Sequence, residues 1–329
     1  MAENNQFSQQ KSDRIGLDDS VEIIGAESLG VRGLCCLVKT EDRRVLIDPG
    51  VALGYRRLGL LPHPRQVAEG ERVRRRIISA LTETTDVVFS HFHGDHVPLR
   101  EANPYQLAIR ELPTTLQSLA VWSKSADDLG EKMARRAQDL EELLGLSLHA
   151  AEGQSVGPMS FSPAVPHGIK GSRQGAVMMT RIDLGSKVFL HASDIQLLDA
   201  ETIDFILDWQ VDIVLAAGPP LYLEALTSEQ RTAARNQALR LAQNVDVLIL
   251  DHHLMRDQKG PKWLDSLSAE AGKKVFCAAD FMGRKRLLLE AERTELYKTI
   301  PVSKDWHDKY AEGLIKAEEY IPASRFSLP

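Results

Sequence analysis

Three histidines and one aspartate lie within six positions of the chain, directly after a short apolar run. The run at 87–89 leads into His91, His93, Asp95 and His96 in the segment "VVFSHFHGDHVPL". An apolar run of this kind is typical of a buried strand, which places the four residues at the strand's end. Imidazoles and carboxylates are costly to bury without partners, and a metal ion suits both. The segment therefore predicts a fold in which a strand end carries part of a metal site.

The spacing within this segment predicts how its side chains are aimed. His91 and His93 are two residues apart at a strand end, so both leave the backbone on the same side. Pro98 suits the first turn of a helix, which places Asp95 and His96 where that helix begins. Neutral imidazoles with carboxylates suit Zn²⁺, with Mn²⁺ and Fe²⁺ as alternatives. A polar surface loop is the competing interpretation, and it leaves the density of ligand-type residues unexplained.

Three later strand-like segments end in residues of the same kind. They supply His167 in "PAVPHG", His191 and Asp194 in "KVFLHASD", and His252 and His253 in "VDVLILDHH". Asp194 has an alternative role as the N-cap of the helix that follows it, and His191 has one as a packed neighbour of the ligands. Because side chains alternate beyond a strand end, we expect only one of His252 and His253 to reach the metal, and alternation alone leaves open which one.

The hydrophobic pattern predicts an alternation of short strands and helices. Strands are expected at 21–25, 34–40 and 43–50, with a hairpin turn at 41–42, and a helix follows at 66–81. The later elements expected are a helical block at 114–144, β-rich segments at 146–193, helices alternating with strands from 201, a strand at 273–279 and a helix at 281–297. Strands in each half, flanked by helices, predict an α/β fold with two facing sheets and helices outside.

Length and composition allow one large globular domain or two ordinary ones. The 329 residues are 43% hydrophobic and 26% charged, which is typical of a chain with a sizeable core. We expect a disordered lead-in at 1–20, one domain at 21–297, and a helical tail at 298–329 packed on that domain. The lead-in lacks a secretory signal and no apolar run is long enough to span a membrane, so a cytoplasmic protein without membrane contact is expected, with a homo-oligomer as an option.

The ligand-type residues, taken in order along the chain, resemble the metallo-β-lactamase-fold hydrolases. The pattern His-x-His-x-Asp-His at 91–96, then His167, Asp194 and His252, carries this resemblance, which covers about residues 21–255. Asp48 in "VLIDPG" matches the aspartate that braces the metal loop in this family. The chain also resembles an uncharacterised prokaryotic branch of predicted metal-dependent hydrolases, through "ESLGVR" (27–32), "DPGVALG" (48–54), "PHGIKGSRQG" (166–175), "HASD" (191–194) and "DHHLMRD" (251–257).

The resemblance implies a four-layer αββα sandwich with two divalent metal ions, zinc first and manganese or iron as alternatives. One ion would be held by His91, His93 and His167, the second by Asp95, His96 and His252, and Asp194 would bridge the two. His191 and His253 would be neighbours of the ligands or alternative ligands. A histidine stands at 93, where the redox branch of the superfamily carries a glutamate, and this favours a hydrolase.

The substrate class is less constrained than the metal site. Two ions would activate a water molecule for attack, and Asp95 would orient it or carry its proton. The substrate-binding candidates are Arg32, Lys170, Ser172, Arg173 and Tyr222. These residues favour a phosphodiester or another small anionic substrate. The alternatives are an ester, thioester or lactone, an RNA, or a metal site that serves a sensory or structural protein. The net charge of −6 counts against nucleic acid, and without an export signal β-lactam hydrolysis is not expected.

Overall fold

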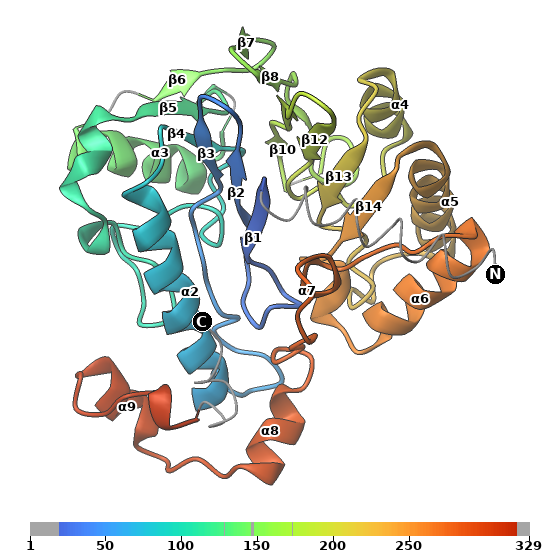
Figure 1. The fold of residues 1–329 in the computed structure, drawn as a ribbon. Helices are drawn as coiled ribbons and strands as arrows, with labels where there is room; N and C mark the ends of the chain where they lie inside the picture. The colour runs from blue at the N-terminus through green and yellow to red at the C-terminus, as the bar shows by residue number, and fades with distance from the viewer. Residues whose placement is uncertain (1–19, 128, 146–147, 173, 321–329) are drawn as a thin grey trace, which may run out of the picture.

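The computed structural model describes residues 20–127, 129–145, 148–172 and 174–320. Within these ranges two six-stranded sheets pack face to face, and helices cover the outer side of each sheet (Figure 1). This αββα arrangement confirms the predicted fold class. Apart from Ser20, the lead-in predicted at 1–20 lies outside the described residues, as do Arg173 and the tail from 321 onward.

The first sheet is formed by the N-terminal half of the chain. In spatial order its strands are β1 (Val21–Gly25), β2 (Cys35–Lys39), β3 (Arg44–Ile47), β4 (Asp86–Phe89), β5 (Ala120–Ser123) and β6 (His149–Ala150). The first three pair antiparallel, with the expected hairpin between β2 and β3, and β3 to β6 pair in parallel. Side chains alternate between two buried faces, since Cys36 lies in the core between the sheets and Leu37 in the core under the helices. Burial on both faces explains why these strands read as continuous apolar runs.

The second sheet continues the same pattern in the C-terminal half. Its strands, in spatial order, are β14 (Val247–Leu250), β13 (Ile213–Ala216), β12 (Val188–His191), β11 (Thr180–Asp183), β8 (Met159–Phe161) and β7 (Ser155–Val156). The strands β12, β13 and β14 are parallel, and the others pair antiparallel. A separate two-stranded ribbon joins β9 (Val165–Pro166) to β10 (Ala176–Val177). Parallel strands of this kind end at a common edge, and this edge carries the site described below.

Five longer helices form the outer layers (Figure 1). The first sheet is covered by α2 (Pro64–Leu81) and α3 (Glu131–Leu144), and the second by α4 (Ala200–Asp208), α5 (Ser228–Asn244) and α6 (Lys259–Ala271). The capping box of Thr227 and Gln230 fixes the start of α5 at Ser228. Among the described residues, no helix combines the length and the apolar character that crossing a membrane requires.

The helix predicted over 114–144 is wrong in its first half. This region contains a 3-10 helix, η2 (Thr114–Ser118), and the strand β5, before α3 begins at Glu131. The four residues of β5 pair with β4 along their whole length. A strand this short inside a Leu- and Ala-rich window has no periodicity of its own, so tertiary pairing decides its conformation.

The C-terminal predictions at 273–279 and 281–297 are also mostly wrong. Phe276 makes only an isolated bridge to Ile249, and the short helix α7 (Ala278–Phe281) follows at once. Gly283, with φ +63°, then ends the helical path, and α8 begins only at Arg293 (Arg293–Thr299). Helix α6 was not predicted.

The C-terminal segments pack beside α2, below the sandwich in the view of Figure 1. Helix α9 (Trp306–Ala311) places the Trp306 ring on Tyr310, with ring centroids 5.1 Å apart. Both rings, together with Tyr320 of the 3-10 helix η4 (Glu318–Tyr320), join the apolar core under the first sheet. The described part of the tail therefore lies on the domain.

Candidate metal centre

The predicted ligands meet at the edge where strands of both sheets end. His91 directly follows the strand region of β4, Asp194 follows β12, and His252 follows β14. His167 follows β9 of the two-stranded ribbon. Residues 90–97, called the metal loop below, run from the end of β4 across this edge. The structure thus brings segments from far apart in the sequence to one place, as the strand-end argument requires.

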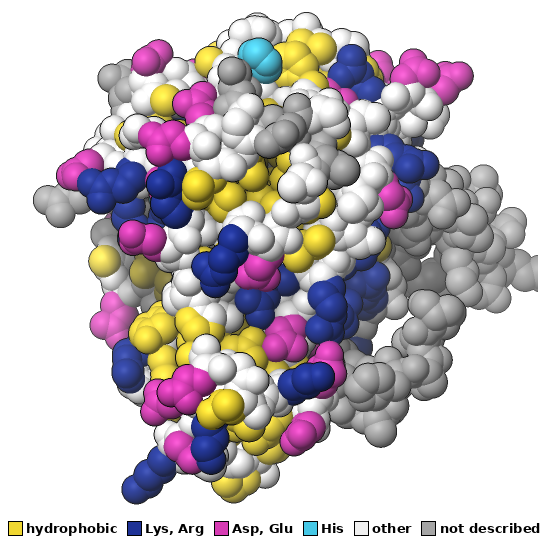
Figure 2. All heavy atoms as spheres, turned by 90° about the vertical axis from the view of Figure 1, so that its left-hand side faces the viewer, with side chains coloured by type: hydrophobic (Ala, Val, Ile, Leu, Met, Phe, Trp, Pro, Cys, Tyr) yellow, Lys and Arg dark blue, Asp and Glu magenta, His cyan; other side chains and the backbone are white. Residues whose placement is uncertain are grey.

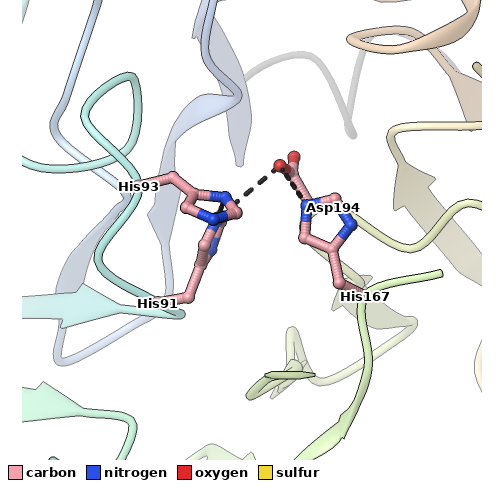
Figure 3. Close-up of side chains that lie close together, drawn as sticks. All are labelled: His91, His93, His167 and Asp194. Atoms are coloured by element: carbon pink, nitrogen blue, oxygen red, sulfur yellow. Dashed lines mark hydrogen bonds and ion pairs between the residues drawn. The ribbon is translucent and has the colours of Figure 1, made fainter. Parts of the chain in front are cut away.

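Four side chains form a first ligand group around the shared aspartate. They are His91, His93, His167 and Asp194, and their nitrogen and oxygen atoms lie within 4.8 Å of one another. Nε2 of His91 lies 2.9 Å from Nδ1 of His93, and Nε2 of His167 lies 2.9 Å from Oδ2 of Asp194. Figure 3 shows the three rings and the carboxylate turned toward one another. This is the set predicted to hold one ion.

A second ligand group faces the other oxygen of the same aspartate. It consists of Asp95, His96 and His252. Oδ1 of Asp194 lies 3.1 Å from Nε2 of His96 and 3.6 Å from Nε2 of His252. Oδ2 of Asp95 completes the group at 3.4 Å from Nε2 of His252. Asp194 therefore presents one oxygen to each group, which is the geometry expected of a bridging ligand.

Two atoms between the ligand groups are buried without hydrogen-bond partners. They are Nε2 of His96 and Oδ1 of Asp194, which lie 3.1 Å apart but do not have the geometry of a hydrogen bond. A lone imidazole nitrogen and a lone carboxylate oxygen are costly to leave unsatisfied away from water. A divalent cation accepts electron pairs from both, so the residues present fit a metal ion.

The pKa shifts of the site residues favour the binding of a positively charged group. Burial lowers the pKa of His93 to about 3 and the pKa of His252 to about 4, so these rings are neutral and offer lone pairs. Burial alone would raise the pKa of Asp194, but the imidazoles of His96 and His252 hold it well below its usual range. Burial also disfavours a charged His96, yet Asp194 and Asp48 outweigh it and raise the pKa of this ring.

Asp48 fixes the rings of two ligands from behind, as the resemblance implied. Nδ1 of His96 donates to Oδ2 of Asp48 at 2.8 Å, which leaves Nε2 free for a metal. The hydroxyl of Ser90 donates to the same oxygen at 2.6 Å and lies 2.9 Å from Nδ1 of His91. Burial would raise the pKa of Asp48, but the hydrogen bond from His96 and nearby imidazole charge lower it. One carboxylate thus orients both histidines.

His252 and His253 both reach the shared aspartate, although strand alternation predicted that only one of them would reach the metal. Nε2 of His253 lies 3.3 Å from Oδ2 of Asp194, on the side of the first ligand group. The strand ends at Leu250, and His253 has helical dihedral angles (φ −79°, ψ −38°), so strand alternation no longer applies. The ring of His252 is oriented differently from that of His96, because Nδ1 of His252 accepts a hydrogen bond from the Gly33 N–H at 3.3 Å.

Hydrogen bonds decide between the alternative roles that the sequence left open for Asp194 and for His191. Helix α4 is capped by Asp199, which accepts from the Thr202 N–H, so Asp194 is not its N-cap. His191 donates from Nε2 to the carbonyl of Leu34 at 2.8 Å and belongs to no ligand group among the described residues. It lies in the core between the two sheets as a neighbour of the site.

The turn after the ligands differs from the prediction. No helix begins at Pro98; instead the N–H groups of His96 and Val97 both donate to the carbonyl of His93. Two glycines hold this turn in place. A Cβ on Gly50 would lie 2.3 Å from the carbonyl carbon of His96, and one on Gly33 would lie 2.6 Å from the carbonyl oxygen of Asp95. Both glycines were missed, although "DPG" and "VRG" mark turns.

The predicted substrate contacts are only partly near the ligands. Lys170, with a side chain 70% exposed, binds Glu201 at 2.8 Å. Ser172 is half-buried in the same segment, and Arg173 lies outside the described residues. Tyr222 is closer, since its hydroxyl lies 3.4 Å from Nδ1 of His253.

Arg32 belongs to a buried network that the sequence did not reveal. It pairs with Glu290, which also binds Arg57 and Arg293. Nearby, Arg256 binds Glu27 at 3.3 Å and places Nη2 3.0 Å from Nε2 of His252. The network ties the loops after β1 and β14 to the second ligand group.

No protein-family model matches the chain. Among curated proteins, a UPF0282 protein of Methanosarcina mazei is 47% identical over 92% of this chain and 99% of its own length. The chain belongs to the UPF0282 family. A UPF0282 protein of Methanopyrus kandleri is 34% identical over 83% of this chain and 97% of its own length, and one of Pyrococcus furiosus is 33% identical over 84% and 91%. The family name states no substrate, as expected of the branch that the sequence resembles.

Solved structures similar to this UPF0282 protein include metallo-β-lactamase-fold proteins. YhfI of Bacillus subtilis matches 82% of this chain and 97% of its own, with 14% identity and a TM-score of 0.49. Tm1679, a metal-dependent hydrolase of the β-lactamase superfamily, matches 78% and 94%, with 13% identity and a TM-score of 0.45. The αββα layers and the cluster at the sheet edge agree with the resemblance found in the sequence.

Replacing Asp48 by asparagine is expected to weaken metal binding by this UPF0282 protein about 10- to 100-fold. Asparagine keeps the shape and tolerates the left-handed backbone at this residue (φ 50°), but its amide nitrogen cannot accept from His96 or Ser90. Competition with a chromophoric chelator measures the affinity. Asp246→Asn is the control, because this exposed aspartate pairs with Lys187 on the surface. Equal affinities in the two variants would mean that Asp48 does not orient the ligands.

Proposed function

We propose that the chain is a hydrolase that uses two divalent metal ions, zinc first and manganese or iron as alternatives, on a phosphodiester or another small anionic substrate. One observation carries the proposal: the two carboxylate oxygens of Asp194 face two separate groups of three ligand-type residues. A single structural ion would need only one such group. Paired sites of this kind are typical of enzymes that hydrolyse phosphate esters and amides.

The residues of the site would have different roles, according to whether their side chains are buried or exposed to the cleft. When bound, a pair of divalent ions supplies an activated water molecule and polarises the scissile group. Buried Asp194 holds the two ligand groups at a fixed separation and keeps bulk water from the space between them. Asp95 has a side chain 21% exposed and faces the cleft described below, so its carboxylate can orient the attacking water and accept its proton. His93, also partly exposed, borders the same cleft.

The alternative functions assign the same metal centre to a different substrate or to no reaction. An ester, thioester or lactone needs no cationic contact beyond the metals. An RNA substrate needs a concentrated basic surface, whereas the face in Figure 2 interleaves Lys and Arg with Asp, Glu and hydrophobic side chains. A sensory or structural metal site is usually closed by its ligands, and the cleft beside His93 and Asp95 favours turnover instead. A cytoplasmic location and a homo-oligomer remain predictions from the sequence.

Metal analysis combined with a substrate panel tests the proposal. We expect two metal ions per chain after reconstitution, and turnover of bis-p-nitrophenyl phosphate above that of matched p-nitrophenyl acetate, thioester and lactone substrates. Preference for one of the neutral substrates would select the ester, thioester or lactone alternative. Tightly bound metal without turnover on any member of the panel would contradict an enzyme and support the sensory or structural role.

A further inference from the structure

A cleft of about 470 Å³ opens directly beside the metal loop. One wall is the metal loop itself, with His93 and Asp95, and the other is the first turns of α3, with Lys132, Met133 and Arg136. Since His93 and Asp95 belong to different ligand groups, the cleft reaches both. It is therefore the space in which the part of a substrate next to the scissile bond would lie.

Arg136 is anchored at the base of this cleft by the metal loop. Its Nη1 donates to the carbonyl of Phe92 at 2.8 Å, and its Nη2 lies 3.0 Å from the position that a Cβ on Gly94 would take. The guanidinium is half-buried and pressed against the turn between His93 and Asp95. A larger residue than glycine at position 94 would push it away. The arginine is therefore held at a defined position beside the ligands.

The positive charge of Arg136 is not neutralised by a salt bridge. Within the described ranges no carboxylate lies in ion-pair distance of its guanidinium, and Phe92 O is its one hydrogen-bond acceptor. The charge of Asp95 acts on this guanidinium, but in the proposed site it would be committed to a metal ion. Glu131 on the same helix binds Arg135 instead, with Nη2 to Oε1 at 3.0 Å. A half-buried guanidinium without a carboxylate can form charge-assisted hydrogen bonds with an anion from solution.

The basic segment that the sequence favoured is less well placed for this role. Lys170 is paired with Glu201 and is not part of the cleft lining. The same segment does approach the cleft at its other end, since a Cβ on Gly175 would lie 3.5 Å from Cε of Met133. Arg136 therefore contacts the cleft more directly than the lysine does.

We propose that Arg136 recognises an oxyanionic group, phosphate or carboxylate, that the substrate carries next to the bond being cleaved. This inference rests on the proposed function, and it names the residue that selects anionic over neutral substrates at the same centre. Among the described residues, Nη2 and Nε of this guanidinium have no hydrogen-bond acceptor, and together they offer two parallel donors that match two oxygens of such a group. The exposed Lys132 adds a second positive charge on the same wall.

The variants Arg136→Gln and Arg136→Ala of the metal-reconstituted protein test the proposal. Glutamine can still donate to the Phe92 carbonyl but carries no charge. We expect both variants to raise KM for bis-p-nitrophenyl phosphate, and Kd for inorganic phosphate in calorimetry, by about 10- to 100-fold, the range of a charged hydrogen bond. For p-nitrophenyl acetate, KM and kcat should stay within about threefold. Arg136→Lys, which keeps the charge, should restore part of the phosphate affinity.

Arg135→Ala is the matched control, because Arg135 is its neighbour in α3 but is 70% exposed and paired with Glu131. This variant should bind phosphate like the unmodified protein, and all variants should retain the same number of metal ions. If phosphate affinity is unchanged in Arg136→Gln while metal and turnover persist, the Arg136 inference is wrong and the hydrolase proposal stands. If no substrate is turned over but phosphate binding still falls in Arg136→Gln, the hydrolase proposal fails and the anion site stands.

Discussion

Asp194→Ala is expected to lose metal and to lower turnover of the best substrate by about 10²- to 10³-fold, the scale seen when a group that stabilises developing charge is removed. Both oxygens of this carboxylate are used, since Oδ2 lies 2.9 Å from His167 and Oδ1 lies 3.1 Å from His96. Without it, buried imidazoles face one another with no negative charge between them. Metal content by inductively coupled plasma mass spectrometry and steady-state kinetics on the same preparation measure the two effects.

Asp199→Ala is the control for this change, because it also replaces an aspartate by alanine, five residues further along the chain. Asp199 caps α4 through the Thr202 N–H, so its loss should cost about 1 kcal/mol of stability while metal content and kcat stay unchanged. Asp194→Asn separates charge from shape, since the amide fills the space but offers only one acceptor oxygen. Two bound ions and undiminished turnover in Asp194→Ala would remove this residue from the centre.

Gly50→Ala is expected to be strongly damaging although Gly50 is not a ligand. The added methyl group would lie 2.3 Å from both the carbonyl carbon of His96 and the amide nitrogen of Val97, closer than atoms can pack. Backbone atoms cannot rotate away as the end of a side chain can, so either the metal loop or the segment after β3 must move. Overpacking of this kind typically costs about 1–3 kcal/mol and occasionally more, and here the loop that moves carries His96. We therefore expect a lower melting temperature together with loss of the second metal ion.

The same substitution at Gly70 provides the comparison. Gly70 lies inside α2, and a Cβ there would meet Leu53 at 3.5 Å, an ordinary contact. Alanine is the better helix former by about 1 kcal/mol, so Gly70→Ala should leave the melting temperature unchanged or raise it. Differential scanning calorimetry of the two variants, with and without metal, measures the difference. A Gly50→Ala protein as stable and as metal-rich as Gly70→Ala would show that the two loops are not in tight contact.

The positions of the ligands could be predicted because each depends on a local pattern. A buried strand reads as an apolar run, and the first polar residues after the run mark its end, as at His91 and Asp194. Parallel strands end at a common edge, so residues that are separate in the sequence can be assigned to one site. The brace provided by Asp48 was predicted only through the family resemblance, since its contact with His96 spans 48 positions.

Predictions from the sequence were wrong or missing where conformation depends on contacts between distant segments. Strand alternation was extended to His252 and His253, although the chain turns after Leu250 and brings both rings to Asp194. Arg136 stood in a segment correctly expected to be helical, but the side of α3 that faces the metal loop is set by packing. The closeness of Gly50 to His96 likewise depends on how two loops cross, and no periodicity encodes it.

The donors of this centre are divided between the two layers of the sandwich, with the metal loop on the first sheet and Asp194 and His252 on the second. Each of the two ligand groups described above takes residues from both halves of the chain. Bound metal would link the two layers at one edge of the sandwich. The layers could then separate only if the metal were released. Filling the centre should therefore raise the free energy of global unfolding rather than stiffen one loop, by an amount that grows with the logarithm of free metal concentration.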